Sequence, residues 1–139
     1  MTRPRVPGQR PAEPGEPAKD RKGLGAHGES LAERHLRALG MRVEARNVRT
    51  RAGEIDLLAR RGRLWIAVEV KTRRHHDAPE QCLADAQRER LTRALLQLAE
   101  VLEPAPRRLR IDVIAVVIRS DRSVELRHFA GNEFEPRIR

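Results

Sequence analysis

The sequence predicts an α/β fold in which a helix, three strands, a second helix and two further strands follow one another. Apolar residues recur at three- and four-residue steps before position 40 and again between positions 84 and 102, which indicates two helices. Shorter segments with alternating or β-branched residues lie between these helices and after the second one. Together these elements form one α/β core, whose strand order the pattern leaves open.

The first helix is expected to begin near Gly25 and to end at Gly40, which stands where a helix C-terminal glycine belongs. Its apolar face is formed by Leu31, Ala32, His35, Leu36 and Leu39. Glu29 is expected in the first turn, which would place one carboxylate near the start of the helix.

Three strands are expected next. Residues 41–46 alternate well enough for a strand, and residues 47–53 are polar, basic and turn-like. Segments 53–59 and 64–72 are two more strands, and the tight connection at 60–63 predicts that they form an antiparallel hairpin.

The second helix follows Pro79 and stops before Pro104 and Pro106. One face carries Ala84, Leu91, Leu95, Leu98 and Leu102, and the other mostly carries Arg88, Glu89, Arg90, Arg93 and Gln97. We interpret Arg88, Arg90 and Arg93 as a solvent-exposed face. Residues 109–118, rich in Ile and Val, predict a buried strand, and residues 123–129 predict an edge strand.

One ordered domain is expected over residues 23–130. Residues 1–22 hold five of the nine prolines and are expected to be a disordered tail, and residues 131–139 are expected to be a C-terminal tail. The single cysteine, Cys82, excludes an internal disulfide. Because no apolar stretch is long enough for a membrane span or a signal peptide, a cytoplasmic protein without membrane association is expected.

The net charge of +9 favours a polyanionic partner, and nucleic acid is the first candidate. Of the 29 basic residues, however, only Lys19, Lys22 and Lys71 are lysines. Such an excess of arginine can result from genome base composition alone, so the charge is weak support.

Two acidic clusters lie on the predicted hairpin: Gly53-Glu54-Ile55-Asp56-Leu57 before its turn and Val68-Glu69-Val70-Lys71 after it. If the two strands pair, Asp56 and Glu69 come near each other, and Glu69 and Lys71 share one face. Neighbouring carboxylates repel unless a positive charge neutralises them. Mg²⁺ or Mn²⁺, which favour oxygen ligands, would do so.

This arrangement suits a metal-dependent phosphodiesterase. Asp56 and Glu69 would ligate the metal, Glu29 could supply another ligand, and Lys71 would orient the nucleophile or neutralise the transition state. The alternative is that Glu54 and Asp56 are ordinary strand-edge charges. Glu69 and Lys71 would then form a surface ion pair worth well under ~1 kcal/mol.

Basic and polar residues flank both clusters and are the candidate nucleic-acid-binding residues: Arg46, Asn47, Arg49, Arg51, Arg73 and Arg74. Each arginine alone could equally be a solvent-facing loop residue. The adjacent His75-His76-Asp77 is interpreted as a polar loop, because no third ligand is spaced to complete a zinc site.

The order of these motifs resembles the YraN-like family of uncharacterised bacterial proteins, within the restriction endonuclease-like superfamily of PD-(D/E)XK nucleases. The matching blocks are Gly28-Glu29-Ser30-Leu31-Ala32, Arg46-Asn47-Val48-Arg49, Gly53-Glu54-Ile55-Asp56-Leu57, Val68-Glu69-Val70-Lys71-Thr72-Arg73 and Arg110-Ile111-Asp112-Val113. The resemblance implies a central mixed sheet flanked by helices, with Asp56, Glu69 and Lys71 at the D...ExK positions. It extends to archaeal Holliday junction resolvases, which imply Glu29 in the site, branched DNA as substrate and a possible homodimer.

The chain departs from the family pattern after Lys71-Thr72-Arg73. It has His75-His76-Asp77-Ala78-Pro79 in place of a Gly- and Pro-containing loop, and Gln87 near the usual position of a lysine. A DNA endonuclease or branched-DNA processing enzyme is the leading hypothesis. The alternatives are a noncatalytic nucleic-acid-binding or scaffold protein that retains the nuclease fold, and a protein-interaction module.

Overall fold

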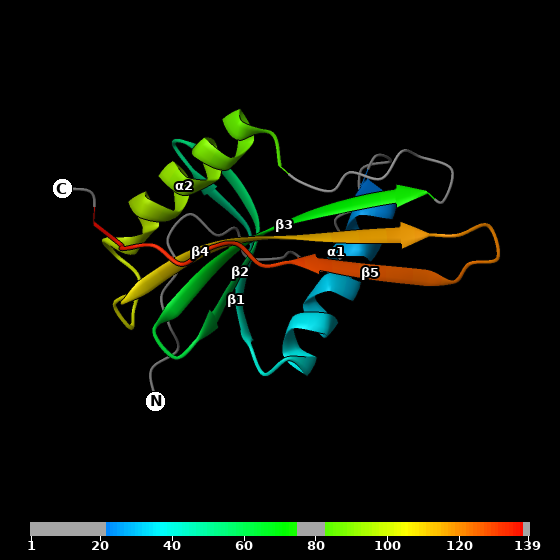
Figure 1. Cartoon of the computed structure of the whole chain (residues 1–139), viewed down its shortest axis with the longest axis horizontal. Coiled ribbons are helices and arrows are strands. Elements are labelled where there is room, and N and C mark those ends of the chain that lie inside the picture. Colours follow the sequence, from blue (N-terminus) through cyan, green and yellow to red (C-terminus); the bar gives the residue numbers. More distant parts are fainter. Residues whose placement is uncertain (1–21, 75–82, 138–139) are drawn as a thin grey trace.

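The computed structural model describes residues 22–74 and 83–137 (Figure 1). Its elements are α1 (Lys22–Ala38), β1 (Arg42–Thr50), β2 (Gly53–Arg61), β3 (Leu64–Arg74), α2 (Asp85–Ala99), β4 (Arg108–Ile118) and β5 (Val124–Phe129). Residues 1–21 of the predicted N-terminal tail lie outside the described residues. The His75-His76-Asp77 loop, Pro79 and Cys82 lie outside them as well.

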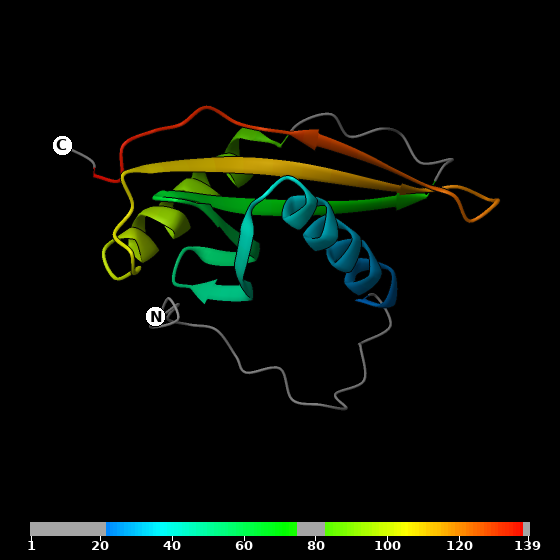
Figure 2. The same cartoon turned by 90° about the horizontal axis from the view of Figure 1, so that it is seen from below.

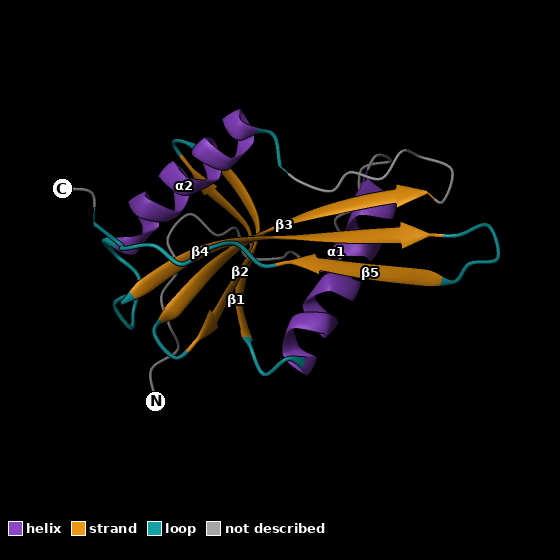
Figure 3. Ribbon diagram, viewed as in Figure 1, coloured by secondary structure: helices purple, strands orange, loops and turns teal. Residues whose placement is uncertain are grey.

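The five strands form one mixed sheet in the order β1-β2-β3-β4-β5. Only β3 and β4 are parallel, and α2 makes the crossover that a parallel pair requires. The other neighbouring strands are antiparallel, including the expected hairpin of β2 and β3. The predicted fold class is therefore confirmed, and the architecture is consistent with a restriction endonuclease-like core. Figure 3 shows the two helices over opposite ends of the sheet.

Each face of the sheet is covered by one helix. The α2-side core contains Trp65, Ala67, Leu91, Leu95, Leu98 and Leu109. The α1-side core contains Ala32, Leu36, Leu57, Ile66, Val68 and Ile114, and Figure 2 shows α1 packed beneath β3 and β4. Odd positions of β3 up to Ala67 thus face α2 and even positions face α1, as alternation along a strand requires.

Helix α1 ends in a motif that the sequence only partly revealed. Gly40 has a φ of +86°, its N–H donates to the Arg37 carbonyl, and the Met41 N–H donates to the Leu36 carbonyl. This Schellman arrangement confirms the capping role of Gly40. It also buries Met41 and leaves Leu39 44% exposed, so the expected place of Leu39 on the apolar face is wrong.

Two expected boundaries also need correction. Helix α1 begins at Lys22, so Glu29 lies beyond the first turn, which contains no acidic residue. Strand β1 continues through the segment expected to be turn-like, because Val48 is fully buried and pairs with Ile55. The turn is confined to the residues after Thr50, whose hydroxyl oxygen accepts the N–H groups of Ala52 and Gly53.

The second half of the chain follows the expected elements closely. Strands β4 and β5 are present, and β5 pairs only with β4 in the described sheet, which confirms it as an edge strand. Ala84 and Leu102, expected on the face of the second helix, lie just outside α2. Phe134, within the expected C-terminal tail, pairs with Leu109 through two backbone hydrogen bonds. No helix in the described ranges combines the length and apolar character needed to cross a membrane.

Candidate active site

The site lies where β2 separates from β3. The two strands pair from Arg61↔Leu64 to Leu57↔Val68, while β3 stays paired with β4 as far as Arg74↔Ile118. Beyond the Leu57↔Val68 pair, the Asp56 side chain takes the place of a backbone partner for Val70. Asp56 Oδ2 accepts the Val70 N–H at 2.8 Å. The Asp56 and Glu69 carboxyl groups are close enough for each to act on the pKa of the other. The hairpin thus brings together the two carboxylates expected to meet.

Glu69 and Lys71 face α2, and Gln87 from the first turn of that helix joins them. Gln87 Nε2 donates to Glu69 Oε1 at 2.9 Å, and Lys71 Nζ donates to Gln87 Oε1 at 3.2 Å. Lys71 Nζ and Glu69 Oε1 are 4.0 Å apart, with the two side chains only 19% and 12% exposed. The Gln87 amide can link Glu69 and Lys71 because it offers both a donor and an acceptor, whereas a lysine at position 87 could not accept a hydrogen bond from Lys71.

Burial shapes the protonation of the acidic pair. It raises the pKa of Glu69 to about 7, and the neighbouring Asp56 charge adds to this, whereas Lys71 and Arg90 oppose it. Burial also raises the pKa of Asp56, although the Val70 N–H opposes this shift. Near neutral pH the pair therefore carries less than its full negative charge, and a divalent cation would compete with protons for the two carboxylates.

The donor set fits a hard cation. Asp56 and Glu69 offer carboxylate oxygens, and Mg²⁺ is often held by one or two carboxylates together with water and substrate phosphate. No group of three or more His, Cys, Asp or Glu residues in the described ranges is arranged to hold a metal. Asp56 and Glu69 are therefore the pair of carboxylates that could hold Mg²⁺ or Mn²⁺ here, with water and phosphate completing its coordination.

Glu29 is on the helix that covers the other face of the sheet. The preceding residue, Gly28, packs so tightly against β3 that a Cβ atom there would lie 2.0 Å from Thr72 Oγ1. Helix α1 therefore contacts β3 one residue beyond Lys71, but at a position that faces away from α2. The role of Glu29 as a further ligand stays a prediction.

The comparison with known proteins places the chain in a family. The sequence pattern of the uncharacterised protein family UPF0102 matches residues 28–116. The chain belongs to this family. A UPF0102 protein of Nocardia farcinica (strain IFM 10152) is 46% identical over 102 residues, which cover 71% of this chain and 80% of the relative. A UPF0102 protein of Syntrophotalea carbinolica (strain DSM 2380 / NBRC 103641 / GraBd1) is 44% identical over 118 residues, covering 80% and 91%.

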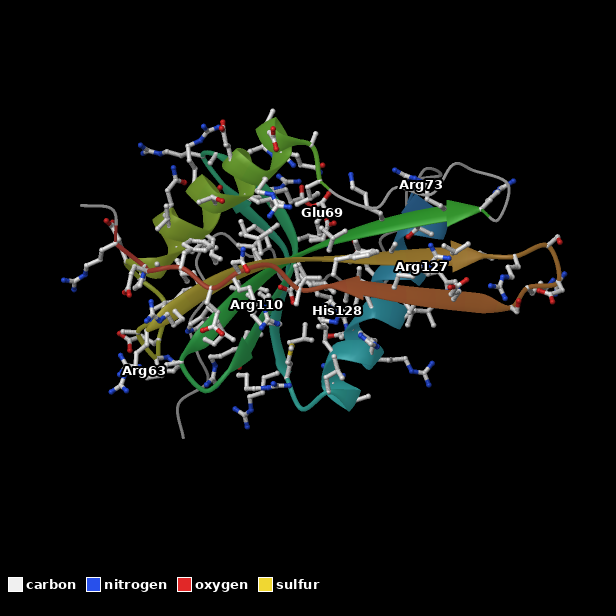
Figure 4. All side chains as sticks on the ribbon, in the orientation of Figure 1. Arg63, Glu69, Arg73, Arg110, Arg127 and His128 are labelled. Carbon is white, nitrogen blue, oxygen red and sulfur yellow. The ribbon has the colours of Figure 1, made fainter. Side chains whose placement is uncertain are left out.

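The expected nucleic-acid-binding residues of this UPF0102 chain lie along β1, the turn after it and the far half of β3. Asn47, Arg49, Arg51 and Arg74 are exposed. Arg46 is 54% exposed and pairs with buried Glu33 on α1, while Arg73 donates to the Thr72 carbonyl. Figure 4 shows Arg73 farther along β3 than Glu69. Their role in binding stays a prediction.

Arg90 on α2 was expected to be solvent-exposed, and this was wrong. Its side chain lies over Gly53 at the start of β2, and its charge acts on Glu69. The helical spacing alone did not reveal this contact, because it depends on how α2 packs against β2 in the folded chain. The arginine three residues after Gln87, on the same helix face, is the signal that could have indicated it.

Sequence reasoning also missed a second polar cluster of the UPF0102 fold. Asp112 on β4 is fully buried, and its carboxylate accepts hydrogen bonds from Arg110, His128 and the Gly131 N–H. His128 also bonds to His35 of α1 at 3.1 Å between ring nitrogens. Burial raises the pKa of Asp112, but the hydrogen bonds from His128 and Arg110 outweigh it and lower that pKa. Figure 4 shows Arg110 and His128 near each other on β4 and β5.

Proposed function

We propose that this chain is a metal-dependent DNA endonuclease of the PD-(D/E)XK type, with branched DNA of the Holliday junction kind as a candidate substrate. The observation that carries the proposal is the placement of Asp56, bonded to the Val70 N–H, beside the hydrogen-bonded chain of Glu69, Gln87 and Lys71 at the point where β2 leaves β3. Two adjacent carboxylates and one ammonium group are side chains suited to the hydrolysis of a phosphodiester with Mg²⁺ or Mn²⁺.

Each residue has a defined task in this proposal. Asp56 and Glu69, once deprotonated, would hold the cation, which supplies Lewis acidity and lowers the pKa of a bound water. Lys71 would donate to the phosphate oxygen on which negative charge develops, or hold the attacking water. Gln87 positions Lys71 through its amide oxygen and Glu69 through its amide nitrogen.

The surrounding charge supports nucleic acid as the substrate class. Exposed arginines on β1 and the following turn, Arg49 and Arg51, and Arg74 at the end of β3 would contact the phosphates that flank the cleaved one. Such contacts position a duplex without reading its sequence, which suits an enzyme that recognises DNA structure. A homodimer on a four-way junction is part of this proposal.

The decisive experiment incubates purified protein with linear, flapped and four-way DNA in Mg²⁺ or Mn²⁺. Cleavage is expected with wild-type protein and is expected to fall by at least ~100-fold in Asp56→Asn, Glu69→Gln and Lys71→Ala. Glu89→Gln, an exposed carboxylate on α2, serves as the control and is expected to cleave normally. Absence of cleavage on every substrate would overturn the proposal.

A noncatalytic nucleic-acid-binding protein is the second candidate, and Gln87 favours it. This amide already satisfies Glu69 and Lys71 without a metal. DNA binding that persists in chelator, weakens steeply with salt and leads to no cleavage would support this second function.

A further inference from the structure

Arg90 has an unusual environment for an arginine on an otherwise exposed helix face. Its aliphatic stem lies across Gly53, where an added Cβ would be 2.9 Å from Arg90 Cδ and 3.2 Å from Cγ. Gly53 has a φ of +145°, a conformation that other residues rarely adopt. Glycine at position 53 therefore lets the arginine side chain lie over the start of β2.

One donor of the guanidinium group, the Arg90 Nε–H, is buried there and has no hydrogen-bond partner among the residues that the structure describes. A buried donor without a partner is costly, so native proteins rarely keep one unless a water or ligand completes it. Arg90 lies about one helical turn after Gln87, which bonds to Glu69 and Lys71. The positive charge of Arg90 acts on Glu69, so the donor belongs to the surroundings of the candidate active site.

We infer that Arg90 is a phosphate-binding residue of this site, whose Nε–H donates to a non-bridging oxygen of a bound phosphodiester. The inference rests on the proposed function, because it takes the phosphodiester of a nucleic acid as the ligand. Arginine suits the task, since its planar group remains charged and forms short hydrogen bonds to phosphate oxygens.

The local charge explains why an anion would bind only when the metal is present. When both carboxylates are ionised, Asp56 and Glu69 balance Lys71 and Arg90, so in that protonation state the metal-free site offers no excess positive charge. A divalent cation adds two positive charges, which a phosphodiester partly neutralises. Phosphodiester binding at Arg90 is therefore coupled to metal binding.

Arg90→Lys tests the donor while keeping the charge, because lysine has no nitrogen at the Nε position. Arg93→Lys is the matched control, since Arg93 is exposed and lies one turn further along α2. Under cleavage conditions, Arg90→Lys is expected to lose activity by about tenfold or more, whereas Arg93→Lys is expected to stay within about twofold of wild type. Equal activities of the two variants would overturn the inference and leave the proposed endonuclease intact.

A second measurement needs neither cleavage nor a variant that folds. Dimethyl phosphate, a small phosphodiester, is titrated into wild-type protein with and without Mg²⁺ while the arginine Nε–H resonances are followed by NMR. The Arg90 signal is expected to shift only with Mg²⁺ present. A shift in a protein that cuts no DNA would uphold the inference and reject the endonuclease, and an unmoved Arg90 signal would reject the inference whatever the cleavage result.

Discussion

The Asp56 carboxylate takes the place of a strand partner for Val70: its Oδ2 accepts the Val70 N–H at 2.8 Å where the pairing of β2 and β3 has ended. This contact fixes the Asp56 carboxyl group beside that of Glu69. The same side chain thus accepts a β3 N–H beyond the paired part of β2 and supplies one of the two proposed metal ligands.

Changing Asp56 should separate these two roles. Asp56→Asn keeps an acceptor for the Val70 N–H and removes the charge that repels Glu69, so its free energy of unfolding should stay within ~1 kcal/mol of wild type. Asp56→Ala leaves that N–H without its acceptor and should lose about 1–3 kcal/mol. Urea unfolding without metal measures both. Equal stability of the two variants would show that the Val70 contact contributes nothing.

The raised pKa of Glu69 predicts that stability depends on pH. The usual pKa of 4.5 applies to the unfolded chain and a pKa of about 7 to the folded one, so the folded state keeps the proton longer. Its stabilising effect is complete below about pH 4.5 and is lost as pH rises through 7, by at most about 3 kcal/mol. The free energies of unfolding of wild type and Glu69→Gln are compared from pH 5 to 8 without metal. The value for wild type should fall relative to that for Glu69→Gln as pH rises, because only wild type loses the proton at position 69. A constant difference between them over that range would contradict the assignment.

Gln87 should matter because it holds both charged partners. Gln87→Ala removes the acceptor of Lys71 and the donor to Glu69, and about a tenfold loss of cleavage is expected. Gln97→Ala, at an exposed position of the same helix, is the control and should cleave like wild type. If Gln87→Ala is as active as this control, Lys71 does not depend on the amide for its position.

The Asp112 cluster should contribute to stability rather than to cleavage. Asp112→Asn leaves the Arg110 guanidinium, only 14% exposed, without its carboxylate partner, which should cost about 3–5 kcal/mol. Because hydrogen bonds lower the pKa of Asp112 in the folded state, its contribution is present above the unfolded pKa of 3.8 and fades as pH falls through the folded pKa. Urea unfolding at pH 7 measures the loss, and Asp121→Asn, an exposed aspartate, should change little. A similar small loss for both variants would disprove the role of Asp112.

The sequence predicted those features that local patterns determine. Alternation identified the β2–β3 hairpin, and with it the meeting of Asp56 and Glu69, because a tight turn fixes which residues face one another. Helical spacing identified α1 and α2 for the same reason. The family pattern further indicated a mixed sheet, which the parallel pairing of β3 and β4 confirms.

Features set by long-range packing could not be predicted from the pattern. Arg90 was assigned to solvent because its contact, Gly53, is on β2, which meets α2 only in the folded chain. Asp112 lies in an apolar strand, and its partners come from β5 and the segment after it. Gln87 looked like the loss of a lysine, yet its amide can bond to both Glu69 and Lys71 only because α2 begins above them.

Calorimetric titration with Mn²⁺ tests the central claim most directly, because it needs no knowledge of the substrate. One binding event is expected for wild-type protein at pH 8, weakening toward pH 6 as Glu69 takes up its proton, and absent in both Asp56→Asn and Glu69→Gln while Glu89→Gln binds normally. If wild-type protein binds no Mn²⁺, or binds it equally well without either carboxylate, Asp56 and Glu69 do not form a metal site.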